Sequence, residues 1–217
     1  HWVTSNGTDP GIDPAQAERR ARADALLMLG LPGTAFIYQG DELGLPEDLD
    51  LQPADLQDPI WERSGHRFKG RDGCRVPLPW NSDSVSFGFS QSGHPWLPQP
   101  AWYARYAVSN QERLPGSMLN LYRAAIAARR RWIRPGDEAE WLADGEYAEY
   151  GLGWRVSSGL EVSVNFSSDH AIRLPENATV MLNSRPEITD CADKQVPPET
   201  AVWYFRGTLA SRSKENR

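Results

Sequence analysis

The strongest hydrophobic pattern near the start of the chain is helical. Asp13-Pro14 predicts an N-cap followed by the first helical residue, and Gln16 stands where a capping box places Glu or Gln. Leu31-Pro32-Gly33 ends the pattern. We therefore predict a helix over residues 14–31, with apolar residues recurring on one face at Ala17, Ala21, Ala25, Met28 and Leu29.

The pattern changes directly after this helix. Residues 34–38 form a short, continuous apolar run rather than an alternating one. Such a run is typical of a strand that is covered on both faces, as in a parallel sheet. Helix, tight turn and buried strand in this order form half of a β/α unit, which predicts an α/β fold for the first part of the chain.

Residues 41–115 are irregular and rich in Pro, Gly, Asp and Trp. A loop of this length inside a compact domain is usually functional. We expect short helical turns within it, around residues 53–57 and 102–107. Ser117 then caps a second helix, whose apolar stripe comprises Met118, Leu121, Tyr122, Ala125, Ala128 and Trp132.

Three arginines, Arg129-Arg130-Arg131, end the second helix. Cations at this end suit the helix dipole. The run is either a solvated helix end or an anion site, and the first interpretation is favoured because charged runs usually face water.

The character of the chain changes at Arg134–Asp137. Short alternating segments follow, separated by turn residues, and they predict a small antiparallel β domain. We therefore divide the chain into residues 1–134, residues 135–207 and a flexible polar tail, 208–217. The predicted strands cover residues 140–142, 152–156, 160–166, 179–182 and 201–205.

Composition excludes some classes of function. The formal net charge of the 217 residues is −6, without the basic patch that a nucleic-acid partner requires. The longest apolar run, Ala25–Leu31, is far shorter than the ~20 residues of a membrane span. Two cysteines, Cys74 and Cys191, favour reduced thiols in a cytoplasmic protein over a disulfide. Because no metal-ligand spacing or phosphate-cradling loop occurs, we expect no metal and no cofactor.

The loop over residues 70–80 concentrates candidate chemistry. It contains Arg71, Asp72, Arg75 and Trp80. A guanidinium presents a rigid fork of donors that suits sugar hydroxyls and carboxylates. The alternative is that one arginine only fixes the loop, by pairing with Asp72 or with the Asp41-Glu42 pair. The spacing leaves both interpretations open.

Other polar and aromatic residues of the long segment support weaker hypotheses. Glycoside hydrolysis uses two carboxylates roughly 5–10 Å apart. The adjacent Asp41 and Glu42 point to opposite sides of an extended chain, so loop anchoring and capping are favoured. His66 and His94 are predicted to be polar loop groups. The tryptophans are either core beneath a lid, which is favoured, or a substrate platform: Trp61, Trp80, Trp96 and Trp102.

Four segments occur in an order that resembles glycoside hydrolase family 13, the α-glucosidases of the oligo-1,6-glucosidase type. They are LPGTAFIYQGDELG at 31–44, GRDGCRVPLPW at 70–80, GSMLNLYR at 116–123 and VPPETAVWY at 196–204. The resemblance implies an α/β plus all-β fold. The end of a (β/α)₈ TIM barrel, with its last strand, helices and active-site loop, would occupy 1–134, and a C-terminal β-sandwich would occupy 135–207.

The resemblance also implies a function. Such enzymes hydrolyse non-reducing-end α-glucosidic bonds of short oligosaccharides with retention. It assigns Arg71 to the non-reducing-end glucose and to the aspartate that holds its hydroxyls, with Arg75 as a second substrate-binding candidate. The family's Asp nucleophile, Glu acid/base and Asn-His-Asp motif have no counterpart in these 217 residues. We therefore predict no catalytic residue here and expect an inactive C-terminal fragment.

Two alternatives remain beside the hydrolase. One is a part of a related enzyme that rearranges its substrate, such as a trehalose synthase or a sucrose isomerase. The other is a non-catalytic protein that binds carbohydrate or supports assembly. In each case the expected small-molecule partner is an α-glucoside, and neither nucleic acid nor membrane is expected as a partner.

Overall fold

The computed structural model describes residues 13–143, 145–188 and 194–207. Within these ranges the chain forms two compact units, residues 13–36 with 121–207 and residues 37–120. Helix α4 (Met118–Trp132) crosses from the second unit into the first. The predicted tail, 208–217, and Cys191 lie outside the described residues, and the division at residue 134 stays a prediction.

Helix α1 (Pro14–Gly30) begins as the sequence predicts. The Asp13 carboxylate accepts a hydrogen bond from the Ala15 amide at 3.3 Å, which satisfies a free N–H of the first turn. Gln16 does not complete a capping box, because its amide donates to Glu199 Oε1 at 2.5 Å. The core face is close to the predicted one, except that Ala21 and Met28 are half-buried. The buried apolar positions are Ala17, Ala23, Ala25, Leu26 and Leu29.

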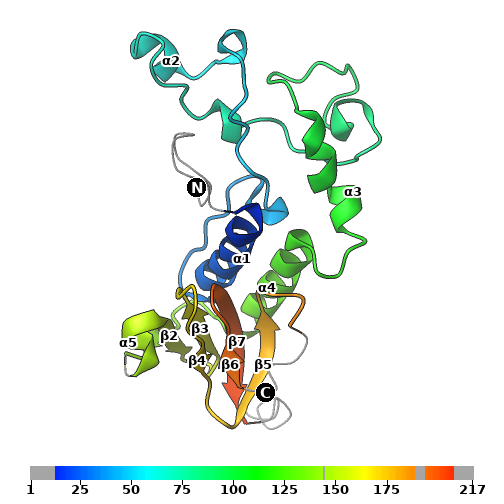
Figure 1. Cartoon of the computed structure of the whole chain (residues 1–217). Coiled ribbons are helices and arrows are strands. Elements are labelled where there is room, and N and C mark those ends of the chain that lie inside the picture. Colours follow the sequence, from blue (N-terminus) through cyan, green and yellow to red (C-terminus); the bar gives the residue numbers. More distant parts are fainter. Residues whose placement is uncertain (1–12, 144, 189–193, 208–217) are drawn as a thin grey trace. The chain divides into compact units, whose positions relative to one another are not determined.

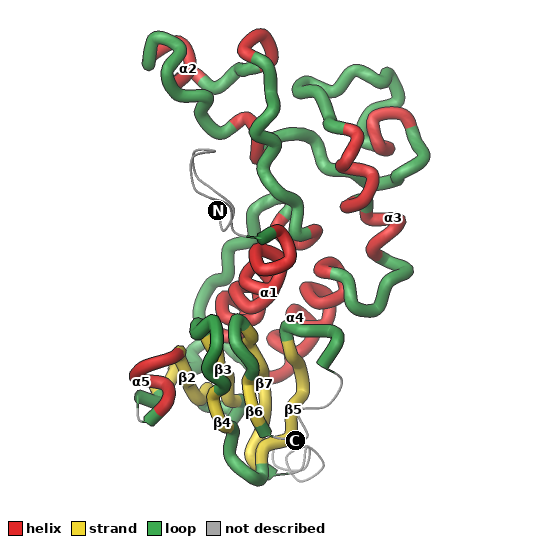
Figure 2. Tube along the Cα trace, in the orientation of Figure 1, coloured by secondary structure: helices red, strands yellow, loops and turns green. Residues whose placement is uncertain are grey.

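The first unit is built on a five-stranded antiparallel sheet in the order β1-β2-β3-β7-β5 (Figures 1 and 2). A second sheet pairs β4 (Ile172–Arg173) with β6 (Gln195–Val196). The five predicted strands are confirmed, whereas β4, β6 and the short helix α5 (Glu146–Tyr150) were not predicted. The bounds of the main strands are β1 Ala139–Trp141, β2 Gly151–Val156, β3 Glu161–Asn165, β5 Ala178–Asn183 and β7 Thr200–Arg206.

The C-terminal end of α1 is buried against this sheet. The indole of Trp203 donates to the Leu26 carbonyl at 2.9 Å, and that of Trp154 donates to the Gly30 carbonyl at 3.0 Å. Gly30 allows this close contact, because a Cβ there would lie 3.0 Å from Trp203 Nε1 and from Val162 Cγ2, closer than most real Cβ contacts. Two tryptophans thus satisfy carbonyls that a helix end otherwise leaves to water.

Helix α4 contributes a third donor to the same helix end. The Arg129 guanidinium donates to the carbonyls of Leu29 at 2.6 Å and Leu31 at 2.5 Å, and also to that of Gly33. The prediction of a solvated arginine run is therefore wrong for Arg129, although Arg130 and Arg131 are exposed. Burial lowers the pKa of Arg129, and the three carbonyls compensate for the water that its charge has lost.

The predicted strand over residues 34–38 is wrong for this chain. These residues form no strand, and the Phe36 side chain is 82% exposed, with Ile37 and Tyr38 exposed as well. A strand needs hydrogen-bonding neighbours on a sheet, and the described residues provide none here. Without such neighbours, the apolar side chains of Phe36, Ile37 and Tyr38 are left exposed.

The second unit is irregular but ordered. Four buried residues, Leu51, Val76, Leu97 and Tyr103, form its core, with Leu45, Leu56 and Phe87 packed against them. The predicted turns around 53–57 and 102–107 are confirmed as η2 and η5. Its elements are η1 Asp41–Leu43, η2 Pro53–Asp55, α2 Pro59–Arg63, η3 Asp72–Cys74, η4 Val85–Gly88, η5 Ala101–Tyr106 and α3 Val108–Gln111.

The stability of the first unit should depend on the ionisation of Glu199. Its carboxylate is buried, with Arg20 at 2.8 Å and Arg19 at 3.0 Å. Burial by itself raises the pKa of Glu199, but the hydrogen bonds from Gln16, Arg20 and Arg19 outweigh it and leave the pKa lowered. A lowered pKa contributes stability that is present above the unfolded-state value of about 4.3 and is lost as pH falls through the folded value.

We therefore expect Glu199→Gln to lower the free energy of unfolding at pH 7, with the gap to wild type closing below about pH 4.3. Denaturant titrations of both proteins across pH 3–7 measure this difference in the free energy of unfolding. Glu138→Gln is the control, because Glu138 is exposed. A gap that stays constant with pH would contradict the assignment.

Candidate functional site

The loop over residues 70–80 depends on two glycines for its path. Gly70 has a φ of +78°, and a Cβ there would lie 2.6 Å from Asp58 Cβ. A Cβ on Gly73 would lie 2.3 Å from the Asp48 carbonyl oxygen. The two segments are joined here, because the Asp48 amide donates a hydrogen bond to the Gly73 carbonyl at 3.1 Å. A side chain at either position would push this loop away from the segment that it packs on.

Asp72 fixes the centre of the loop. Its side chain is only 1% exposed. One carboxylate oxygen, Oδ2, accepts hydrogen bonds from the amides of Gln57 at 2.6 Å and Asp58 at 2.7 Å. A buried carboxylate is tolerated where donors replace water, so Asp72 ties the loop to the start of α2.

Asp58 makes the complementary contact from the other side. Its Oδ1 caps α2 by accepting from the Ile60 amide at 3.0 Å. Its Oδ2 accepts from the Arg71 amide at 3.1 Å and from Arg75 Nη1 at 2.9 Å. The two backbone hydrogen bonds are the main reason that the pKa of Asp58 is lowered. Asp58 thus remains an anion that organises both arginines.

The two arginines are placed differently. Arg75 Nη1 lies between Asp58 and Asp72, at 3.5 Å from Asp72 Oδ1. Burial by itself lowers the pKa of Arg75, but the hydrogen bond that Arg75 donates to Asp58 and the charges of both aspartates outweigh it, with a contribution from Tyr38, and leave the pKa raised. Arg71 is exposed, and its guanidinium has no hydrogen-bond partner among the described residues. Arg75 therefore fixes the loop, while the Arg71 side chain is exposed, with Glu47 as a neighbouring charge.

The carboxylates after α1 anchor the local backbone, as favoured from the sequence. Asp41 Oδ2 accepts from the Tyr38 amide and Glu42 Oε2 from the Gly40 amide, each at 2.9 Å. His66 stacks on Trp61 with ring centroids 4.7 Å apart and lies 3.1 Å from Glu62 Oε2. None of these contacts forms the separated carboxylate pair of a glycosidase.

The tryptophans of this unit are not core, which corrects the favoured prediction. Trp80 is 51% exposed, Trp96 and Trp102 are also exposed, and Trp61 is half-buried. The small core of the unit is filled instead by Leu51, Val76, Leu97 and Tyr103. The indoles thus present flat apolar faces at the surface of this chain.

The described residues offer few other reactive or metal-binding groups. Cys74 is a free thiol and lies 3.1 Å from the Arg71 carbonyl oxygen. No cluster of three or more His, Cys, Asp or Glu side chains in this part of the chain is placed to hold a metal ion. Nor do these residues include a helix with the length and apolar character needed to cross a bilayer.

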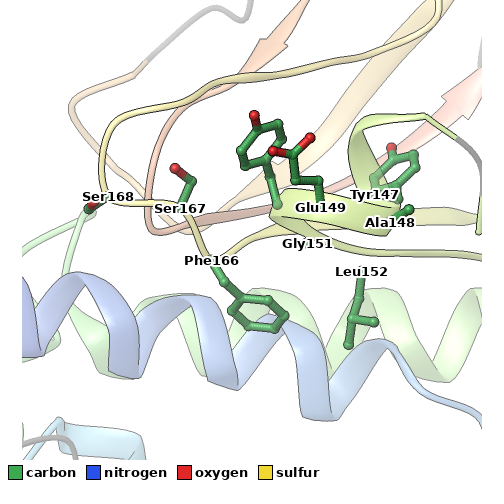
Figure 3. A pocket seen from close by; sticks show the side chains of 9 residues that line it. Tyr147, Ala148, Glu149, Gly151, Leu152, Phe166, Ser167 and Ser168 are labelled. Atoms are coloured by element: carbon green, nitrogen blue, oxygen red, sulfur yellow. The ribbon is translucent and has the colours of Figure 1, made fainter.

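A separate hollow of about 510 Å³ lies in the first unit, beside α5 (Figure 3). Leu152 and Phe166 point to one side of it, while Glu149 and Tyr147 point to the other. The hollow contains no arginine, and neither Arg71 nor Arg75 lines it. The loop over residues 70–80 therefore remains the candidate sugar-binding site.

Comparisons with known proteins identify the family. The alpha-amylase catalytic domain family matches residues 5–136. The oligo-1,6-glucosidase of Heyndrickxia coagulans is 32% identical over 215 residues, covering 90% of this chain and 38% of that protein. A probable alpha-glucosidase of Rhizobium meliloti is 42% identical over 113 residues, covering 52% of this chain and 20% of that protein.

The fold comparison agrees with this result. The isomaltulose synthase SmuA from Protaminobacter rubrum has a TM-score of 0.69 and 25% identity, covering 92% of this chain and 39% of that one. The chain belongs to the alpha-amylase family, glycoside hydrolase family 13, whose relatives have the (β/α)₈ barrel fold. It spans less than two-fifths of the length of the relatives described here.

Asp58 is the important residue that sequence reasoning missed. The sequence did contain a signal for Asp58, because Asp58-Pro59 repeats the capping pattern of Asp13-Pro14.

We expect Asp58→Ala to release the Arg71 amide and Arg75 together and to speed amide hydrogen exchange across residues 56–75 by at least ~10-fold, the equivalent of ~1.4 kcal/mol. Asp50→Asn is the control, since Asp50 is exposed. Equal exchange in both variants would show that Asp58 does not organise the loop.

Proposed function

We propose that this chain is the C-terminal part of a cytoplasmic α-glucosidase, which releases glucose from the non-reducing ends of short α-glucosides with retention. In this proposal residues 1–134 belong to the (β/α)₈ barrel and residues 135–207 form the C-terminal β domain. The catalytic carboxylates come from polypeptide outside these 217 residues. Relatives named α-glucosidase and oligo-1,6-glucosidase support the reading.

The observation that carries the proposal is the unequal placement of the two arginines. Arg75 is held by Asp58 and Asp72, whereas the Arg71 guanidinium is exposed, makes no hydrogen bond within the described residues and has the half-buried Glu47 as a nearby charge. An exposed guanidinium on an ordered backbone is placed to receive hydroxyl and carboxylate acceptors. Arg71 thus binds the terminal glucose and the aspartate that holds it. Arg75 remains a second substrate-binding candidate, acting mainly by fixing the loop.

The proposed substrate-binding role of Arg71 is tested by substitution in the complete glucosidase polypeptide. Arg71→Ala should lower kcat/KM on maltose or isomaltose by about 100-fold, since a hydrogen bond to a charged group is worth roughly 1.5–3 kcal/mol. Arg71→Lys should recover only part of this, because an ammonium lacks the fork geometry. Arg63→Ala is the matched control, on an exposed arginine at the end of α2. If Arg71→Ala matched the control, Arg71 would not be a substrate residue.

The 217-residue chain by itself should have no glycosidase activity. Its sequence contains no Asn-His-Asp motif, and the apolar run at 36–38 is exposed. We expect purified chain, produced in a host lacking α-glucosidase, to release no glucose from maltose or isomaltose above the rate of a buffer blank. Steady glucose release that co-purifies with the chain would refute this expectation.

A second candidate is an enzyme that rearranges the glucosidic bond instead of hydrolysing it. The likeness to an isomaltulose synthase favours this candidate. Hydrolysis and isomerisation differ in whether water or the released sugar accepts the glucosyl group. Product analysis of the complete enzyme on sucrose separates them: glucose plus fructose indicates hydrolysis, while a new disaccharide indicates isomerisation.

A further inference from the structure

The tryptophans of the second unit differ in whether another ring covers the indole. Trp61 stacks on His66, and Trp102 packs edge-on against two tyrosines. Trp80 and Trp96 are 51% and 48% exposed, and neither indole has a ring or cation contact among the described residues. Exposure of one apolar side chain does not by itself mark a site. What distinguishes Trp96 is the place at which its backbone is held.

The segment that carries Trp96 is fixed beside the loop over residues 70–80. The side-chain amide of Gln57 donates to the Trp96 carbonyl oxygen at 2.9 Å. The backbone amide of the same residue donates to Asp72 Oδ2 at 2.6 Å. Gln57 therefore joins the backbone of Trp96 to the residue that directly follows Arg71.

Two further contacts hold the residues that follow Trp96. Leu97 is fully buried and shares the core of the unit with Val76. The side-chain amide of Gln99 donates to the Pro77 carbonyl oxygen at 2.9 Å. Both partners belong to the same loop, so the segment is attached to this loop on both sides of the exposed indole. Trp96 is thus a large apolar side chain on a backbone that is ordered before any ligand arrives.

Trp80 is held at a different place. Its amide donates to the Phe87 carbonyl oxygen at 2.8 Å, and its carbonyl oxygen accepts from the Ser109 amide at 3.0 Å. Neither partner belongs to the part of the loop that carries Arg71. Of the two uncovered indoles, Trp96 is therefore the one that is tied to this part of the loop.

We propose that the Trp96 indole binds the second sugar ring of an α-glucoside, the ring that leaves when the glucosidic bond breaks. The proposal rests on the proposed function, in which Arg71 binds the terminal glucose. Asp72 and Gln57 separate the two side chains along the contacts described above, which suits neighbouring rings of one substrate. The C–H face of a pyranose ring packs on a flat indole, while the hydroxyls at its rim stay free for hydrogen bonds. An indole supplies this contact area at a low cost in conformational entropy.

Two substrates that share the glucosyl group but differ in the leaving group test the proposal in the complete glucosidase polypeptide. Maltose contains a second sugar ring, whereas α-glucosyl fluoride does not. Trp96→Ala should lower kcat/KM on maltose by about 10-fold, mainly by raising KM, and change kcat/KM on α-glucosyl fluoride by less than about 2-fold. Trp96→Phe should recover most of the activity on maltose, because it retains a flat ring. Phe89→Ala is the matched control, since Phe89 lies in the same unit and is also 48% exposed.

Trp96→Leu keeps the test decisive if the alanine variant folds poorly. Leucine fills much of the same volume but lacks the flat face, so it should show the same loss on maltose alone. An equal loss on both substrates, or no loss on either, would overturn the proposal, because a contact that only stabilises the fold serves both substrates alike. Failure of the proposed function is recognised separately, since Arg71→Ala would then leave the activity on both substrates unchanged.

Discussion

The buried C-terminal end of α1 is the constraint on which the first unit depends. Its carbonyls accept hydrogen bonds from Trp154, Trp203 and Arg129, which come from two strands and from α4. A helix end buried without such donors would be strongly destabilising. Gly30 favours the close approach, because a Cβ there would lie only 3.0 Å from the Trp203 indole and from Val162. Helix, sheet and α4 are therefore joined at one place, although their residues are far apart in the sequence.

The second unit is organised by carboxylates rather than by regular secondary structure. Asp58 and Asp72 together accept from four backbone amides, and both face the Arg75 guanidinium. This arrangement fixes the backbone around Arg71 while leaving its side chain exposed. The affinity for a ligand is higher when the donor is already oriented, because less conformational entropy is lost on association. The proposed sugar-binding role of Arg71 depends on this preorganisation.

The sequence predicted the elements that local chemistry determines. Both long helices and five strands followed from capping residues and periodicity, as at Asp13-Pro14 and Ser117. The strand at 34–38 failed because a strand depends on neighbours that sequence pattern cannot guarantee. Arg129, Glu199 and Asp58 were missed as tertiary anchors, because each pairs with groups that only folding brings near. The loop at 70–80 was found from its composition, but which arginine is paired required the structure.

In the proposed function, these residues form the end of a barrel and a β domain within a larger glucosidase. The intact mass of the native protein, captured from its source with an antibody against the β domain, tests it most directly. We expect a mass more than twice the 24.3 kDa of this chain, in line with relatives of which the chain covers 20–39%. A native mass near 24.3 kDa would contradict the glucosidase reading and point to a binding or assembly role.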